Sequence, residues 1–202
     1  MIAAFALTPL ASPFAAAQVR WDAGADVGVM QRVTTGAAPL APSPEPGPVG
    51  ELRAHIAILP MLRMGPYLAH EIAPLSAGAP REITDAGLRA KVSPPLLALP
   101  WRSWLFVGVG YARAYEPSHH LGGAAGGTFV QGEGGGFLET RVGVGLGYRL
   151  DRRWELFAEL GGRIGLLFAG SMYDPAGCGC GEPYEGKDSF ALSLSLGLSL
   201  YP

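Results

Sequence analysis

The sequence has little charge, few cysteines and almost no long apolar runs, and each shortage narrows the class of protein. Only 16% of its 202 residues are charged, and 15 basic against 17 acidic residues leave a formal net charge of −2. This balance gives no reason to expect nucleic acid as a partner. Apart from the N-terminal segment, no stretch is long and apolar enough for a membrane-spanning helix. Any membrane role therefore has to use strands.

Glycine and proline, by contrast, are abundant. The 30 glycines and 18 prolines make up just under a quarter of the chain and interrupt almost every stretch, which disfavours long helices. Disorder is not expected either, because 49% of the residues are hydrophobic and the net charge is small. The composition therefore favours one Gly-rich domain of the all-β class.

Residues 1–17 are predicted to be a cleaved export signal. They carry no charge, contain an apolar stretch, and end in three alanines that fit a signal-peptidase site just before Gln18. Pro9 and Pro13 would break a helix in this segment, which counts against a transmembrane or core helix. Residues 18–202 are expected to form the mature domain.

Cys178 and Cys180 are the only cysteines, and glycines flank them. Outside the cytoplasm the two thiols are expected to be oxidised, and the glycines would ease a tight ring. A zinc site needs more than two thiolates, and only Asp174, Glu182 and Glu185 lie nearby as further ligands. A loop staple or an incidental pair is therefore favoured over a metal site, and no cofactor is expected.

Eight segments alternate large apolar residues with polar or small ones, which is the pattern of strands with one apolar face. In the clearest, Ser189–Leu200, every even position is Phe or Leu and every odd position is Ser, Ala or Gly. The segment 67–73 is the weakest, because neither phase keeps both His70 and Glu71 off the apolar face. The remaining segments are residues 19–33, 51–62, 84–98, 104–111, 138–150 and 154–164.

The connections between these segments are predicted to alternate in length. Short turns are expected at residues 63–66, 100–103 and 151–153, and long loops at 34–50, 74–83, 116–136 and 169–188. The Pro-rich stretch 39–48 is expected to be an extended surface loop. Short turns at one end and long loops at the other are the layout of a bacterial outer-membrane barrel with its turns in the periplasm.

Aromatic residues gather at the ends of the predicted strands, as they do at membrane–water interfaces. One girdle is expected at the short-turn end, formed by Trp21, Tyr67, Trp101, Trp104, Tyr148 and Trp154. A looser second girdle is expected at the other end, formed by Tyr111, Tyr115, Phe137, Phe168 and Phe190.

The face opposite the apolar one is expected to line the lumen. An eight-stranded barrel is only wide enough for side chains to fill it, so lumen charges should pair with one another as structural ion pairs. A plugged interior is expected rather than a wide pore, and narrow conduction stays open. The predicted lumen charges are Arg20, Asp22, Asp26, Arg53, His55, Arg89, Lys91, Glu139, Arg141, Glu155, Glu159 and Arg163.

In the hairpin at 142–156 and the closing strand at 190–200, the chain resembles the small eight-stranded outer-membrane β-barrel family, the OmpA- and OmpX-like barrels. The resemblance covers residues 19–202 and rests on pattern rather than on an invariant motif. One departure is that the family usually ends in an outward-facing aromatic residue, whereas Tyr201 falls in the inward phase and Pro202 follows it.

The resemblance implies an all-β, eight-stranded antiparallel up-and-down transmembrane β-barrel in the outer membrane of a Gram-negative bacterium. Its long loops would be extracellular and both termini periplasmic. The implied partners are outer-membrane lipids, lipopolysaccharide, the outer-membrane assembly machinery and periplasmic chaperones, and the expected state is a monomer. The expected role is structural, adhesive or surface-contact, without catalysis, and no catalytic, cofactor-binding or metal-binding residue is assigned.

Two alternatives remain at this point. A lipid A-modifying enzyme would need a serine nucleophile, a histidine base and an orienting acid, for which Ser118, His119, His120 and Glu116 are the candidates. Adjacency in a loop does not by itself supply that geometry. A soluble lipocalin-like carrier would instead turn the apolar face inward around a hydrophobic ligand. The tryptophan positions and the regular loop layout count against the carrier.

Overall fold

The computed structural model describes residues 20–34, 45–74, 80–95, 100–121, 128–130, 133–170 and 189–202. The predicted export signal and both cysteines lie outside these residues. Within the described part of the chain, no helix is long and apolar enough to cross a membrane. The eight long strands are β1 (Trp21–Thr34), β2 (Gly47–Ala57), β3 (Leu62–Ala73), β4 (Arg81–Val92), β5 (Trp101–Glu116), β8 (Glu133–Arg149), β9 (Trp154–Gly170) and β10 (Ser189–Leu200).

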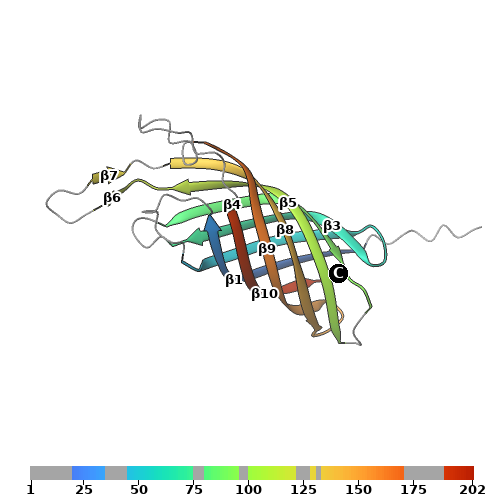
Figure 1. The fold of residues 1–202 in the computed structure, drawn as a ribbon. Coiled ribbons are helices and arrows are strands. Elements are labelled where there is room, and N and C mark those ends of the chain that lie inside the picture. The colour runs from blue at the N-terminus through green and yellow to red at the C-terminus, as the bar shows by residue number, and fades with distance from the viewer. Residues whose placement is uncertain are drawn as a thin grey trace, which may run out of the picture.

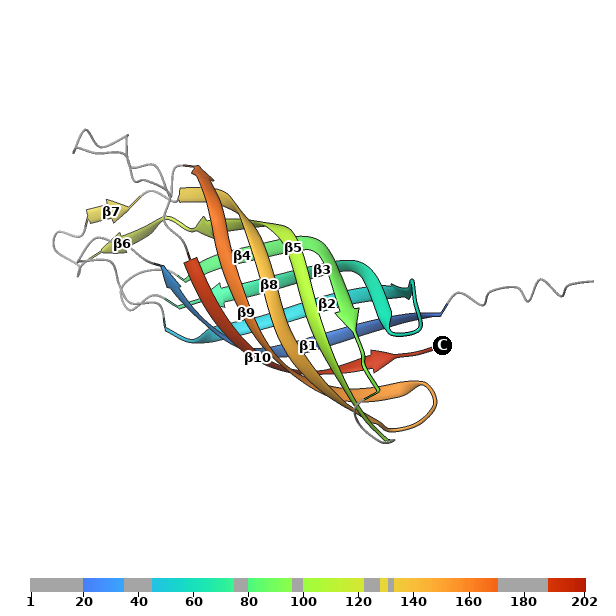
Figure 2. The same cartoon turned by 45° about the vertical axis from the view of Figure 1, so that its right-hand side comes forward.

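These eight strands close into an antiparallel barrel (Figure 1). Each strand pairs with its neighbours in the chain, and β1 pairs with β10 to complete the cylinder. The connection between β5 and β8 contains a separate hairpin, β6 (His119–Leu121) and β7 (Thr128–Val130), which extends past the barrel rim (Figure 2). The prediction of an all-β, eight-stranded up-and-down barrel is confirmed.

The predicted turns are only partly correct. The β2–β3 turn is residues 58–61 rather than 63–66, and Gly65 and Pro66 lie inside β3. The β2–β3 ladder is interrupted around Pro66, because proline has no N–H to donate. The β4–β5 connection is residues 93–100 rather than 100–103, so it is one residue longer than the β3–β4 connection, residues 74–80, at the opposite end. The strict alternation of short and long connections was therefore wrong.

The third predicted turn, at residues 151–153, is confirmed. Asp151 Oδ1 accepts hydrogen bonds from the backbone N–H groups of Arg153, at 2.6 Å, and Trp154, at 2.8 Å. An aspartate that satisfies backbone donors two and three residues on is typical of a tight turn. These two hydrogen bonds also hold the pKa of the Asp151 carboxyl below its usual value.

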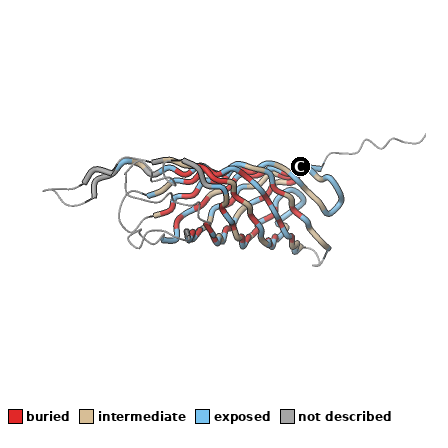
Figure 3. The backbone as a smooth tube through the Cα atoms, turned by 45° about the horizontal axis from the view of Figure 1, so that its top comes forward, coloured by how far each residue is buried: buried red, intermediate tan, exposed pale blue. Residues whose placement is uncertain are grey.

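Exposure alternates along every barrel strand, with the apolar phase facing outward (Figure 3). In β10, Leu192, Leu194 and Leu196 are each more than half exposed, whereas Ala191 and Ser195 are buried. An apolar belt of this extent needs lipid around it. The lipocalin-like alternative is therefore wrong, because its apolar face would have pointed inward.

The girdle at the short-turn end is smaller than predicted. Trp21, Trp101, Tyr148 and Trp154 face outward, and the rings of Trp101 and Tyr148 lie 5.0 Å apart. Trp104 and Tyr67 instead point into the lumen, where they are 2% and 3% exposed. These two residues were assigned to the girdle because each lies near a strand end, although each is in the inward phase of its strand.

The girdle at the long-loop end also loses a member. Tyr111, Tyr115 and Phe190 face outward, as predicted. Phe137 is only 1% exposed, next to a register irregularity between Gly136 and Leu138 that shifts the alternation of β8. The side chain of Phe168 lies outside the described residues.

A charge placed in the middle of the apolar belt should separate a membrane barrel from a water-soluble one. Val107 is 58% exposed at mid-strand in β5, and Val107→Arg is expected to lower the free energy of unfolding in lipid vesicles by about 2–4 kcal/mol. Gln31→Arg, at the long-loop end of β1, is the control and should cost at most about 1 kcal/mol. Denaturant titrations in vesicles measure both. Equal, small losses would show that the belt faces water.

Candidate functional site

The lumen is filled with paired charges of both signs. Within the described residues, Arg63 and Arg102 are half-buried and reach in to pair with lumen carboxylates. The buried cations are Arg32, Arg53, Arg89, Lys91, Arg141 and Arg163, and the buried carboxylates are Asp22, Asp26, Glu51, Glu71, Asp85, Glu139, Glu155 and Glu159. The predicted set omitted Arg32, Glu51, Glu71 and Asp85, and it wrongly included Arg20, which precedes β1 and is exposed.

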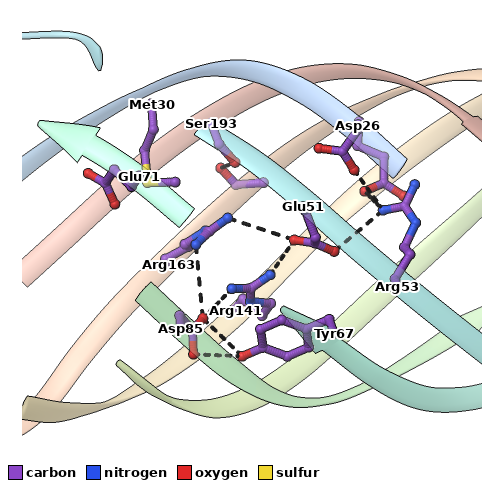
Figure 4. Close-up of polar contacts among 12 residues, drawn as sticks. Asp26, Met30, Glu51, Arg53, Tyr67, Glu71, Asp85, Arg141, Arg163 and Ser193 are labelled. Carbon is purple, nitrogen blue, oxygen red and sulfur yellow. Dashed lines mark hydrogen bonds and ion pairs between the residues drawn. The ribbon is translucent and has the colours of Figure 1, made fainter. Parts of the chain in front are cut away.

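Glu51, on β2, is the centre of this network (Figure 4). Its carboxylate accepts hydrogen bonds from Arg89 Nη1, at 2.9 Å, and from Arg141 Nη1. Arg53 Nη1 and Arg163 Nη2 lie 3.6 and 3.8 Å from its oxygens. Four guanidinium groups from four strands therefore share one carboxylate, which ties opposite walls of the barrel together.

Glu159, on β9, is a second junction, and it lines the same central cavity as Glu51. Its carboxylate accepts hydrogen bonds from Arg53 Nη1 at 2.7 Å, Arg89 Nη2 at 2.6 Å and Trp104 Nε1 at 2.7 Å. Hydrogen bonds to an ionised group are the strong ones, and three of them offset much of the cost of burying this charge. The indole donor explains why Trp104 lies inside the barrel rather than at the interface.

Aromatic rings stack against the same cations. The guanidinium carbon of Arg89 lies 3.8 Å from the Phe106 ring centre, and that of Arg141 lies 3.7 Å from the Tyr67 ring centre. Lys91 Nζ lies 3.7 Å above Trp104. The Phe106 and Tyr67 rings each cover one face of a guanidinium group that is also bound by carboxylates, so cation–π attraction adds to these ion pairs.

Glycines of the inward phase make room for these rings. A Cβ on Gly145 would lie 2.1 Å from the Trp104 ring, and one on Gly110 would lie 2.2 Å from the Tyr67 hydroxyl. The glycines that alternate along β5 and β8 therefore provide the space that lumen aromatics need. They do not leave the lumen hollow.

Arg32, on β1, holds the long-loop end of the network. Its Nη2 lies 2.9 Å from Glu71 and 2.8 Å from Glu139, and its Nη1 donates to the Ser189 hydroxyl at 3.0 Å. Arg163 Nη1 donates to Glu139 at 3.1 Å and so connects this cluster to the centre.

Tyr201, which follows β10, closes the short-turn end. Its hydroxyl donates to Glu155 at 2.9 Å, and its ring lies 5.1–5.7 Å from the guanidinium groups of Arg63, Arg102 and Arg149. Burial and the neighbouring Glu155 carboxylate raise the pKa of the Tyr201 hydroxyl. The inward phase predicted for this residue is confirmed.

Among the described residues, little free space remains at the centre of the lumen. A cavity of about 20 Å³ lies at the centre, lined among others by Glu51, Arg89, Arg141 and Glu159. This volume holds about one water molecule. The lumen charges are therefore in contact with one another rather than with a column of water.

The chemistry available in the lumen is limited by this pairing. His55 Nδ1 lies 2.9 Å from Asp22, but His55 Nε2 is buried and has no hydrogen-bond partner in the described part of the chain. The His–Asp pair therefore activates no serine there. No group of three or more His, Cys, Asp or Glu residues that could hold a metal occurs within the described ranges.

The residues considered for a lipid A-modifying enzyme lie at the start of the β6–β7 hairpin. Ser118 is exposed between β5 and β6, and His119 and His120 begin β6. The side chains of Glu116, His119 and His120 lie outside the described residues. The lipid A-modifying enzyme therefore stays an alternative to the predicted non-catalytic role.

Removal of the Glu159 charge should show how much the network contributes to stability. Glu159→Gln leaves Arg53 and Arg89 short of a counter-charge in the lumen, and breaking such a buried pair costs about 3–5 kcal/mol. Glu45→Gln, at an exposed position before β2, is the control and should change the free energy of unfolding by less than about 0.5 kcal/mol. Denaturant unfolding in detergent micelles measures both. Equal losses in the two variants would contradict the network's role.

Comparisons with known proteins agree with this architecture. No family model and no curated protein matches the sequence. Neisserial surface protein A has a TM-score of 0.57 at 17% identity over 89% of this chain and 96% of its own. A major outer membrane protein of Thermus thermophilus gives 0.54 at 16% identity, covering 92% and 100%. The attachment invasion locus protein Ail of Yersinia pestis gives 0.50 at 10% identity, covering 90% and 98%.

At these identities the likeness concerns the fold. It agrees with the closed, all-antiparallel eight-stranded barrel of this chain. The chain has the fold of the small eight-stranded outer-membrane β-barrels.

Proposed function

We propose that this chain is a non-catalytic and non-conducting outer-membrane barrel whose role is structural, adhesive or surface-contact. The observation that supports this proposal is the packed lumen. Carboxylates and guanidinium groups bind one another from wall to wall, and the central cavity holds about one water molecule. A barrel filled in this way stiffens its own walls and leaves no space for a substrate at the centre of its described lumen.

The proposed orientation places the long loops outside the cell and both termini in the periplasm. Outer-membrane barrels have short periplasmic turns and longer extracellular loops. The turns at residues 58–61 and 150–153 lie at the same end as the start of β1 and the end of β10. The proposed surroundings are outer-membrane lipids and lipopolysaccharide, reached through the outer-membrane assembly machinery and periplasmic chaperones, with the barrel as a monomer.

The loop end is the surface that remains for contact with other molecules. The outward faces of the strands are apolar and suited to lipid, and the lumen charges are bound to one another. The β5–β8 connection carries the β6–β7 hairpin beyond the rim and so extends this surface (Figure 1). Any ligand or surface partner is therefore expected at the loops.

Conductance measurements in planar lipid bilayers test the packed lumen directly. The refolded full chain is expected to insert without discrete current steps in concentrated potassium chloride, because no continuous water column passes Glu51 and Glu159. A wide porin added to the same bilayer serves as the positive control. Regular, voltage-independent steps from this chain alone would overturn the non-conducting role.

Loop exchange tests where binding resides. If residues 117–132 are grafted onto an unrelated eight-stranded barrel, surface adherence conferred by the full chain should move with them, while their replacement by a short turn should abolish it. The lumen variant Glu159→Gln, assayed as cells that still display folded barrel, serves as the control and should keep its adherence. Loss of adherence in the lumen variant alone would contradict the proposal.

A further inference from the structure

The outward face of the barrel has one polar interruption. Of the outward-facing barrel-strand residues whose exposure the structure gives, only His70, Glu82 and Arg113 carry an imidazole, a carboxylate or a guanidinium group. They lie on β3, β4 and β5, three neighbouring strands, and all three are near the long-loop ends. Elsewhere on the belt, the described outward side chains are uncharged.

Two of these residues belong to one row across the sheet. His70 is the register partner of Thr84, and Thr84 is the register partner of Arg113. His70 Nδ1 and Thr84 Oγ1 lie 3.0 Å apart. Residues directly opposite one another on adjacent strands have Cβ atoms about 5 Å apart, so the guanidinium stem of Arg113 starts beside the Thr84 hydroxyl.

Tyr111 adds a second hydroxyl to this row. Gly136, on β8, is the register partner of Arg113, and a Cβ on Gly136 would lie 1.9 Å from the Tyr111 hydroxyl oxygen. The phenol of Tyr111 therefore lies over Gly136, next to Arg113. The polar row formed by His70, Thr84, Arg113 and Tyr111 thus comes from three adjacent strands, and the Tyr111 phenol extends it over β8.

The depth of the polar row matches the lipid head groups. Ten residues of β5 separate Trp101, in the girdle at the short-turn end, from Tyr111. At about 3.4 Å per residue and a strand tilt of about 40°, this spans about 26 Å, close to the height of the apolar band of outer-membrane barrels. Arg113 lies one step further out, at the level of the head groups, where a charge is far less costly than at the bilayer centre.

No described residue forms an ion pair with the guanidinium of Arg113, and the Arg113 side chain is exposed. Glu82 is the nearby carboxylate, but it is the register partner of Tyr115 and so lies one step closer to the loops. A planar guanidinium flanked by hydroxyls and an imidazole favours a phosphate, which it can bind with two parallel hydrogen bonds.

We propose that the polar row binds the phosphate group of a lipid in the leaflet at the long-loop end. Arg113 would supply the charge, and Thr84, Tyr111 and His70 would supply hydrogen bonds from the same face. The apolar side chains below the row, among them Leu88 and Val109, would contact the acyl chains of the same lipid. The proposed orientation, with the long loops outside, enters only in the choice of lipid A as the probe.

Lipid binding to the refolded full chain in a non-ionic detergent tests this proposal. The probes are lipid A with both phosphates and the same lipid A after removal of both, with bound lipid measured by native mass spectrometry. Arg113→Gln should weaken binding of the phosphorylated form about fivefold, the change that corresponds to about 1 kcal/mol for one arginine near a lipid head group. Arg153→Gln is the matched control, since it removes an exposed arginine at the other end of the barrel, and it should leave binding unchanged.

Two results would overturn the proposal. One is equal binding of the phosphorylated and dephosphorylated lipids by the unmodified chain. The other is an equal effect of Arg113→Gln and Arg153→Gln, which would show that lipid binding depends on the net charge of the protein and not on a site at Arg113. A failure of the proposed orientation can be distinguished from a failure of the site. If the orientation is wrong, the long loops will be inaccessible to a membrane-impermeant label on whole cells. The effect of Arg113→Gln in detergent would then persist and would still support the site.

Discussion

Closure of the sheet is the constraint on which the rest of the structure depends. β1 and β10 pair from Ala23↔Leu200 to Thr34↔Ser189, and this seam leaves no barrel strand with an unpaired edge. Lipid offers no hydrogen bonds to backbone groups, so a sheet in the membrane has to close. Closure with eight strands also fixes a lumen that only side chains can fill.

The narrow lumen and the apolar belt determine one another. Because side chains alternate, a shift of one residue in register would turn the leucines of β10 inward and expose the lumen charges to lipid. The ion pairs of Glu51 and Glu159 form only in the observed register, since their partners come from several strands. Hydrophobic burial therefore comes from the lipid outside, while the network inside favours one arrangement of the walls.

Much of this architecture could be predicted from the sequence, because period-two alternation indicates both where the strands lie and which of their side chains face outward. Ser189–Leu200 was predicted with its observed bounds, and the inward phase of Tyr201 was also correct. The errors lie where another feature of the sequence, such as a turn signal, conflicted with the alternation of side chains along a strand. Gly65 and Pro66 indicated a turn, although proline is tolerated where a ladder is interrupted.

The lumen aromatics and the ends of the strands were harder to predict. Trp104 and Tyr67 were assigned by their position near strand ends, whereas their phase already indicated the lumen. Arg113 lies beyond the predicted segment 104–111, where β5 extends further toward the long loops, so the polar row was not visible. Arg32 lies within the predicted segment 19–33, in its inward phase, but was not assigned to the lumen. The pairing partners of Glu51 depend on register across several strands, which a single sequence does not specify.

The central claim is that the exposed apolar side chains face lipid while the charges face one another inside. Spin labels placed singly at Val107, Val144 and Leu196, after replacement of Cys178 and Cys180 by serine, measure this directly in reconstituted vesicles. We expect all three labels to relax with dissolved oxygen and to be shielded from a water-soluble nickel complex, with the opposite result at Gln31 on the rim. Ready access of the nickel complex to Val107 and Leu196 would contradict the account, because the belt would then face water.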